Sequence, residues 1–169
     1  MSTGNAPVEH PVHELLERRH SPYAFDPERP VDAGDLASLF EAARWTMSSY
    51  NAQPWRYIVG VRGRSTDTWD KVFSVLVEGN QPWARNAPVL ALGVIRKNFD
   101  YNDKPNKAAA HDLGAASAML TIEATARGLV VHQMIGIEPE QAHQLFGLDA
   151  GEEALTALAI GYEGAAANI

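Results

Sequence analysis

The sequence contains no cysteine, which excludes disulfides, thiolate nucleophiles and cysteine-ligated metals. Cations are also scarce, because 14 Lys and Arg stand against 21 Asp and Glu and give a formal net charge of −7. That balance disfavours nucleic acid as the main partner, since phosphate backbones are bound chiefly by clustered cations. No apolar run approaches the roughly 20 residues that cross a bilayer, and the polar start lacks the apolar stretch of a secretory signal. We therefore expect a cytoplasmic protein without a membrane partner.

What is present is ordinary for a folded chain. Hydrophobic residues make up 46% of the sequence and charged residues 21%, which argues against disorder. A length of 169 residues predicts one domain, and we find no repeat, low-complexity tract or Ser/Gly linker that would divide it. We expect residues 1–11 to form a flexible lead-in and residues 12–169 to form a single domain.

Hydrophobic periodicity predicts helices and strands in irregular alternation. The expected helices cover residues 12–19, 32–46, 66–77, 106–127 and 139–146. The expected strands cover residues 55–61, 89–95, 129–135 and 155–162. Since no regular βαβ alternation is visible, the fold class is α+β rather than a doubly wound sheet. The helix at 106–127 is apolar on nearly every side, so we expect it to be buried on several faces.

The first candidate site is the run Arg18-Arg19-His20-Ser21 near the N-terminus. Guanidinium groups donate bidentate hydrogen bonds to phosphate, and a serine hydroxyl adds another donor. The same run is also typical of a helix end whose cations offset the helix dipole. Taken alone, the run favours that simpler interpretation.

The second candidate is the segment Ser48-Ser49-Tyr50-Asn51-Ala52-Gln53-Pro54-Trp55. A carboxamide presents both a donor and an acceptor, so Asn51 and Gln53 suit the edge of a planar heterocycle that carries N–H and C=O groups. Ser, Asn and Pro are also common turn residues, and a capped turn between a helix and a strand explains the segment equally well.

The third candidate is Gln133-Met134-Ile135-Gly136-Ile137, where a glycine follows an apolar strand. Such a glycine can bring backbone N–H groups close to a ligand, although it is more often only the end of a strand. No metal site stands out in the sequence. His111 and His132 lie beside apolar residues, so we expect packed histidines there rather than proton donors.

Taken in order, the three segments and the helical run Asp112-Leu113-Gly114-Ala115 form a pattern that resembles the nitroreductase family of FMN-dependent oxidoreductases. The resemblance covers about residues 13–162, and the second segment is its most specific part. It implies a mostly antiparallel sheet flanked by helices, in an intertwined homodimer with FMN at the subunit interface. The residues that the resemblance assigns to FMN are Arg19, His20, Ser21, Asn51, Gln53, Ile135 and Gly136. The first three would bind the phosphate and ribityl chain. The two amides would face the pyrimidine edge of the flavin, from the same or the partner subunit. The strand around the last two would place a backbone N–H at flavin N5.

The implied activity is a two-step exchange in which NAD(P)H reduces the flavin at N5 and an electron-poor small molecule, such as a nitroaromatic or a quinone, then takes the electrons. Because the cofactor carries the reactive atoms, no catalytic side chain and no metal are needed. The sequence departs from the family at Tyr23, where a cation is usual, at Met47, where proline is usual, and after Arg127, where no basic tail residue follows. The alternative is therefore a protein that stores or senses FMN without turnover.

Overall fold

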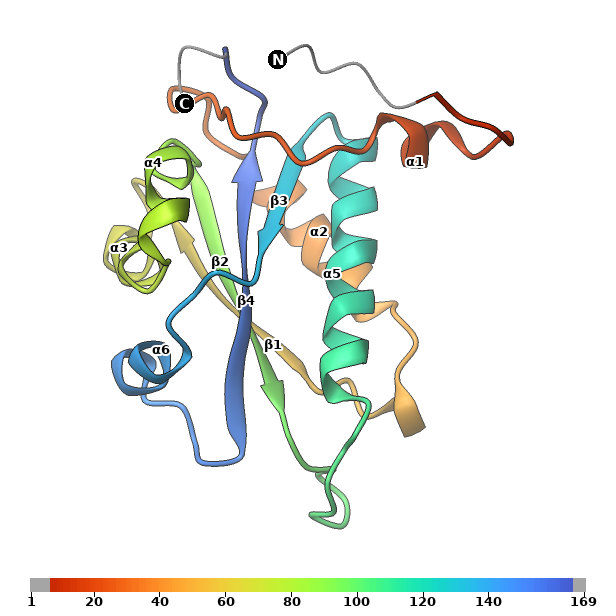
Figure 1. Cartoon of the computed structure of the whole chain (residues 1–169), viewed down its shortest axis with the longest axis vertical. Coiled ribbons are helices and arrows are strands. Elements are labelled where there is room, and N and C mark those ends of the chain that lie inside the picture. Colours follow the sequence, from red (N-terminus) through yellow and green to blue (C-terminus); the bar gives the residue numbers. More distant parts are fainter. Residues whose placement is uncertain (1–6, 166–169) are drawn as a thin grey trace.

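One four-stranded sheet organises the computed structural model, which describes residues 7–165 (Figure 1). The strands lie in the order β1 (Trp55–Val61), β2 (Val89–Arg96), β4 (Glu152–Gly161) and β3 (Val130–Met134). Every neighbouring pair is antiparallel, which confirms the expected α+β fold with an antiparallel sheet. The expected lead-in at 1–11 falls partly outside the described residues.

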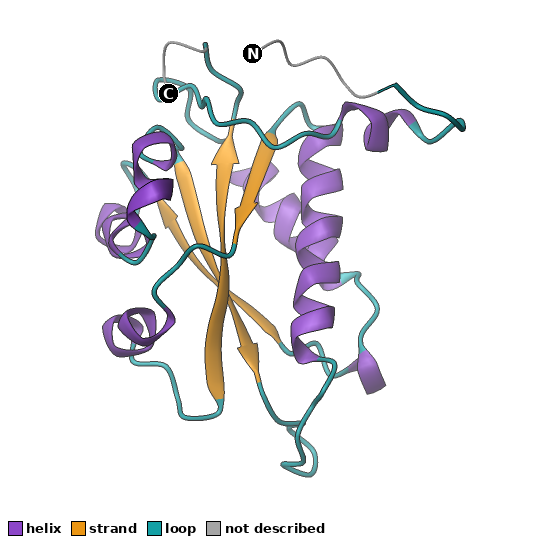
Figure 2. Cartoon of the chain, in the orientation of Figure 1, coloured by secondary structure: helices purple, strands orange, loops and turns teal. Residues whose placement is uncertain are grey.

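Helices cover both faces of this sheet (Figure 2). One face carries α2 (Ala33–Arg44) and α5 (Ala109–Ala126), and short helix α1 (Glu14–Arg18) lies beside α5. The other face carries α3 (Thr66–Ser74), α4 (Gln81–Ala84) and α6 (Pro139–Phe146). Two 3-10 turns, η1 (Ser49–Asn51) and η2 (Glu78–Asn80), join these elements.

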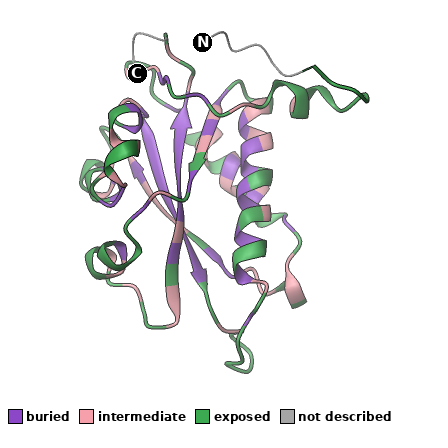
Figure 3. Ribbon diagram, viewed as in Figure 1, coloured by how far each residue is buried: buried purple, intermediate pink, exposed green. Residues whose placement is uncertain are grey.

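The core is divided in two by the sheet, because successive side chains of a strand point to opposite faces. In β2, Leu90, Leu92 and Val94 pack toward α3, α4 and α6, whereas Val89 and Ala91 pack toward α2 and α5. Every residue of β2 except Arg96 is buried, and Figure 3 shows the central strands as the most enclosed part of the molecule. Strands β2 and β4 each pair on both sides and are therefore the central strands of the sheet.

Several element ends differ from the predicted ones. Strand β4 begins at Glu152 rather than 155, since Glu152 and Glu153 already pair with β2 although their side chains are polar. Helix α3 ends at Ser74 because Leu76 pairs with Ile137 in an isolated bridge. Helix α5 begins three residues later than expected, where the Asn106 side chain accepts the Ala108 N–H at 3.0 Å. Helix α1 is shorter than the predicted 12–19, and helix α4 was not predicted, because one or two helical turns carry little periodicity.

Helix α5 is buried only on the side that faces the sheet and α2. Its opposite side exposes Ala110, Gly114, Ala118 and Met119 to solvent, the last with 43% of its surface accessible. The expectation of burial on several faces is therefore not met within a single chain. Across residues 7–165, no helix combines the length and the apolarity that crossing a membrane requires.

Candidate functional site

The N-terminal cationic segment lines a cavity against α5 and β3. Its volume is about 420 Å³. The lining residues are Leu16, Arg19, Ser21, Ala118, Thr121, Ile122, Val131 and Gln133. Arg19 Nη1 lies 3.4 Å from Ser21 Oγ, to which it donates, so the guanidinium and the hydroxyl are held side by side. The structure thus places two of the three predicted phosphate ligands together in one concavity.

His20 faces a different direction from its two neighbours. Its Nε2 lies 3.2 Å from a carboxylate oxygen of Glu163, and its Nδ1 lies 3.1 Å from the Arg18 carbonyl. The imidazole therefore contacts the segment after β4 rather than the cavity that contains Arg19 and Ser21.

Gln133 lines this cavity, although within the third candidate segment only Ile135 and Gly136 were expected to contact the cofactor. Its Nε2 donates to Thr121 Oγ1 at 2.8 Å and to the Ser117 carbonyl at 3.1 Å, which locks the amide against α5. Behind it, the Tyr57 hydroxyl lies 2.8 Å from Ser117 Oγ. Burial raises the pKa of Tyr57 to about 12, so this hydroxyl stays protonated at neutral pH. The available signal was the alternation of a strand, which puts Gln133 and Ile135 on the same face.

The amide segment forms a strained turn around η1. Tyr50, Asn51 and Gln53 have φ values of 52°, 54° and 46°, a left-handed region that non-glycine residues seldom adopt. The two amide side chains converge, because Gln53 Nε2 donates to Asn51 Oδ1 at 3.2 Å. Strained backbone conformations of this kind are more frequent at functional sites, so the turn is a candidate binding element.

Two side chains hold this turn, one from within it and one from α5. Ser48 Oγ accepts the Gln53 N–H at 3.0 Å, and Asp112 Oδ2 accepts the Ser49 N–H at 3.0 Å. Asp112 lies in the first turn of α5, nine residues before the cavity residue Thr121 (121 − 112). At 1.5 Å per residue, this separation is about 13 Å along the helix. Within one chain, the amide turn and the cationic cavity therefore contact different parts of α5.

Gly136 follows β3 in a tightly packed corner. Its carbonyl accepts from the Val77 N–H at 3.1 Å and from Asn80 Nδ2 at 3.0 Å. A Cβ atom on Gly136 would lie 2.5 Å from Asn80 Nδ2 and 2.8 Å from Val77 Cγ2, so any larger residue would require these side chains to shift. The preceding Ile135 is 78% exposed. Among residues 7–165, the Gly136 N–H donates no hydrogen bond to another backbone carbonyl.

Tyr23 stands where a cation was expected from the resemblance. Its ring makes an edge contact with Trp83, at 5.4 Å between ring centroids, and a tilted contact with His132, at 4.8 Å. His132 Nδ1 in turn lies 2.9 Å from the Pro22 carbonyl. His132 is therefore packed in an aromatic cluster, as expected, whereas His111, for which packing was also expected, has a side chain that is 80% exposed.

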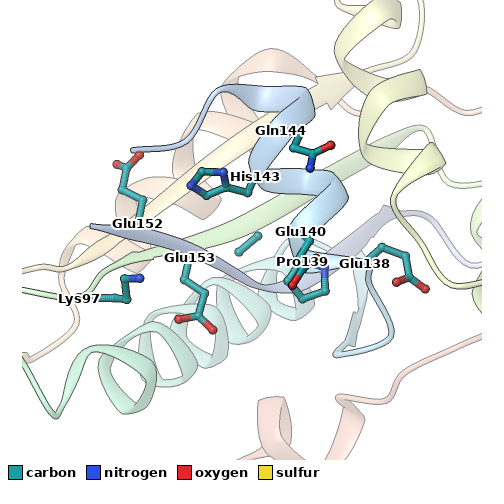
Figure 4. A pocket seen from close by; sticks show the side chains of 9 residues that line it. Lys97, Glu138, Pro139, Glu140, His143, Gln144, Glu152 and Glu153 are labelled. Atoms are coloured by element: carbon teal, nitrogen blue, oxygen red, sulfur yellow. The ribbon is translucent and has the colours of Figure 1, made fainter. Parts of the chain in front are cut away.

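A larger concavity lies between α6 and the start of β4, on the α6 side of the sheet. Its volume is about 670 Å³, and its lining includes four glutamates, Lys97 and His143 (Figure 4). Figure 4 shows the His143 ring and the Glu152 carboxylate projecting from opposite walls. None of the predicted site residues lines it. Across the described part of the chain, no three His, Asp or Glu side chains converge in a way that could hold a metal ion.

The chain was compared with protein-family models, with known proteins and with solved structures, and all three comparisons gave matches. The family model described as "Nitroreductase family" matches residues 16–162. A solved structure described as an oxidoreductase containing FMN is 31% identical, with a TM-score of 0.90 over 100% of this chain and 86% of that chain. A Mycolicibacterium smegmatis protein described as an uncharacterised 15.4 kDa protein is 37% identical over 115 residues, which cover 64% of this chain and 76% of that protein.

A further relative is the major NAD(P)H-flavin oxidoreductase of Aliivibrio fischeri. It is 37% identical over 73 residues, which cover 43% of this chain. The match spans only about a third of that protein's own length, since it covers 34% of it.

Proposed function

The chain belongs to the nitroreductase family, and from that membership we propose that it is an FMN-dependent oxidoreductase, which passes reducing equivalents from NAD(P)H to an electron-poor small molecule such as a nitroaromatic or a quinone. Two relatives support the cofactor and the electron donor: the solved structure described as containing FMN and the relative named as an NAD(P)H-flavin oxidoreductase. One structural observation carries the proposal. Arg19 and Ser21 share a cavity with Gln133, on the strand that leads to the N–H of Gly136.

The donor chemistry of this cavity fits a phosphorylated ligand. Arg19 supplies a fixed cation, Ser21 a hydroxyl, and Leu16 and Ile122 an apolar wall beside them. Charge-assisted hydrogen bonds from guanidinium to phosphate are among the strongest in proteins. Arg19 and Ser21 would therefore hold the FMN phosphate, with Gln133 beside the ribityl chain. His20 would support this phosphate site from outside the cavity, because its imidazole contacts Glu163.

The corner after β3 fits the reactive edge of the same ligand. Gly136 lies three residues beyond Gln133, a span of about 10 Å in an extended chain. Its N–H would face flavin N5, and the bonds that the Gly136 carbonyl accepts from Val77 and Asn80 hold the next peptide group in place. When bound, FMN supplies the acceptance and release of hydride, so the protein need only position it and exclude competing reactions.

We assign the amide turn to the pyrimidine edge of a flavin held mainly by a second copy of the chain. The exposed small residues of α5, Ala110, Gly114 and Ala118, permit close approach of another helix. In a two-fold pair of α5 helices running antiparallel, the first turn of one helix lies beside the last turns of the other. Asn51 and Gln53 of one chain would thereby approach the Arg19 cavity of its partner.

Anaerobic titration with NADH and NADPH tests the proposed activity. The purified protein, reconstituted with FMN, is expected to show a visible flavin absorption band. This band should bleach with one of the two nucleotides and return when a quinone is added. Bound flavin that stays oxidised with both nucleotides would instead favour storage or sensing of FMN, and it would contradict the proposed turnover.

A further inference from the structure

Asp112 is a buried carboxylate in the first turn of α5. Its side chain is 4% exposed. Its Oδ2 accepts the Ser49 N–H at 3.0 Å, and its Oδ1 lies 3.1 Å from Nδ1 of His111, whose own side chain is 80% exposed. In the described range 7–165, no Lys or Arg forms an ion pair with it. Because a buried carboxylate is costly unless it is hydrogen-bonded, the contacts with Ser49 and His111 together explain this placement, and the one with Ser49 is the contact outside α5.

The turn that Asp112 contacts needs an external anchor. Three of its four residues from Tyr50 to Gln53 have positive φ, and each is a non-glycine residue that disfavours this conformation. The bond from the Gln53 N–H to Ser48 Oγ closes the turn on itself. The bond from the Ser49 N–H reaches across 63 positions to Asp112 and connects the closed turn to α5. The turn also contacts Phe99 through the Tyr50 ring and β1 through Arg56, but neither of these contacts connects it to α5.

From this we propose that Asp112 is a positioning residue for cofactor recognition: by accepting the Ser49 N–H, it fixes the place and shape of the amide turn, and so directs Asn51 and Gln53 at the pyrimidine edge of the flavin. The inference rests on the proposed function, since it requires FMN as the ligand. Asp112 itself touches no part of the cofactor. Its effect on recognition passes through the backbone of the turn, so it should be absent when the acceptor oxygen is removed and retained when only the charge is removed.

Three substitutions separate these effects. Asp112→Asn keeps a carbonyl oxygen that can accept the Ser49 N–H, whereas Asp112→Ala removes it. Asp112→Leu also removes the acceptor but fills the buried space with an apolar side chain. It therefore provides a variant that lacks the acceptor without leaving a cavity. Tyr57→Phe is the matched control, because it deletes a 2.8 Å hydrogen bond between a partly buried residue and α5 that does not involve the turn.

The probe is a pair of cofactors, FMN and N3-methyl-FMN, titrated against the full-length apoprotein. Methylation removes the N3–H donor of the pyrimidine edge and adds bulk there, but it leaves the phosphate unchanged. The wild type and the Asp112→Asn and Tyr57→Phe variants are expected to prefer FMN by about tenfold or more, as the loss of one well-placed hydrogen bond implies. In Asp112→Ala and Asp112→Leu, the preference is expected to fall to about threefold or less, since both ligands then meet a displaced turn.

A merely structural role would lower the melting temperature of the variants without changing this ratio. Folded Asp112→Leu protein that keeps the wild-type preference would therefore overturn the inference and leave the proposed function intact. Equal affinity of the wild type for the two flavins would also overturn it, because the amides would then not face that edge. Wild-type protein that binds neither flavin would instead refute the proposed function.

Discussion

Replacing Gly136 with alanine tests how the corner after β3 is built. The added Cβ would meet Asn80 Nδ2 at 2.5 Å and Val77 Cγ2 at 2.8 Å, both well inside van der Waals contact. Overpacking of this kind costs about 1–3 kcal/mol. Relief by rotation of Asn80 would break its 3.0 Å bond to the Gly136 carbonyl, so it saves little. For a chain of this size, about 2–4 °C per kcal/mol predicts a melting temperature lowered by about 2–12 °C.

Thermal unfolding of the apoprotein measures this effect without the cofactor. Gly79→Ala is the matched control, since a Cβ there meets nothing within 4 Å and the residue lies in η2, next to Asn80. The double variant Gly136→Ala/Asn80→Ala should lose less than the sum of the two single variants, because the closest clash is then removed. A Gly136→Ala protein that melts with the wild type would refute the packing argument. Additive losses would show that Asn80 is not the obstacle.

The remaining predictions concern the cofactor cavity, the assembly and the pH dependence of stability. Arg19→Ala should weaken FMN binding by about 1.5–3 kcal/mol, the worth of a charged hydrogen bond, whereas the exposed Arg85→Ala should leave fluorescence titrations unchanged. Refolding a mixture of Arg19→Ala and Asn51→Ala chains should restore about one flavin site per mixed dimer, and no recovery would place both residues of a site in one chain. Tyr57 should make the fold less stable in alkali: its pKa rises from 10.0 to about 12 on folding, so its contribution is complete below pH 10 and falls by about 2–3 kcal/mol by pH 12. Urea unfolding at pH 9 to 12 should show that additional loss in the wild type and not in Tyr57→Phe.

The sequence predicted the sheet better than the ends of its elements. Apolar runs at 55–61 and 89–95 identify β1 and β2 because a strand buried on both faces, such as β2, needs a continuous apolar stretch. The start of β4 was missed because pairing with Arg96 and Ile95 depends on the opposite strand and not on the polar side chains of Glu152 and Glu153. Local pattern cannot report a contact that the partner strand determines.

The same distinction holds at the candidate site. The pairing of Asn51 with Gln53 and of Arg19 with Ser21 could be inferred because each pair is only two residues apart. The contacts of Gln133 with Thr121 and of Asp112 with Ser49 could not be inferred, since these partners lie 12 and 63 positions away in the sequence. The exposed side of α5 is a third case: its apolar composition could be seen in the sequence, but the surface that we propose covers it belongs to a second copy of the chain.

We propose above all that the concavity containing Arg19 and Ser21 holds the phosphate end of FMN. The most direct measurement is the flavin content of the protein after incubation with excess FMN and gel filtration, compared with Arg19→Ala. We expect about one FMN per wild-type chain, retained through the column, and a substantially lower content in the variant. A colourless wild-type protein, or equal retention by both proteins, would contradict that claim.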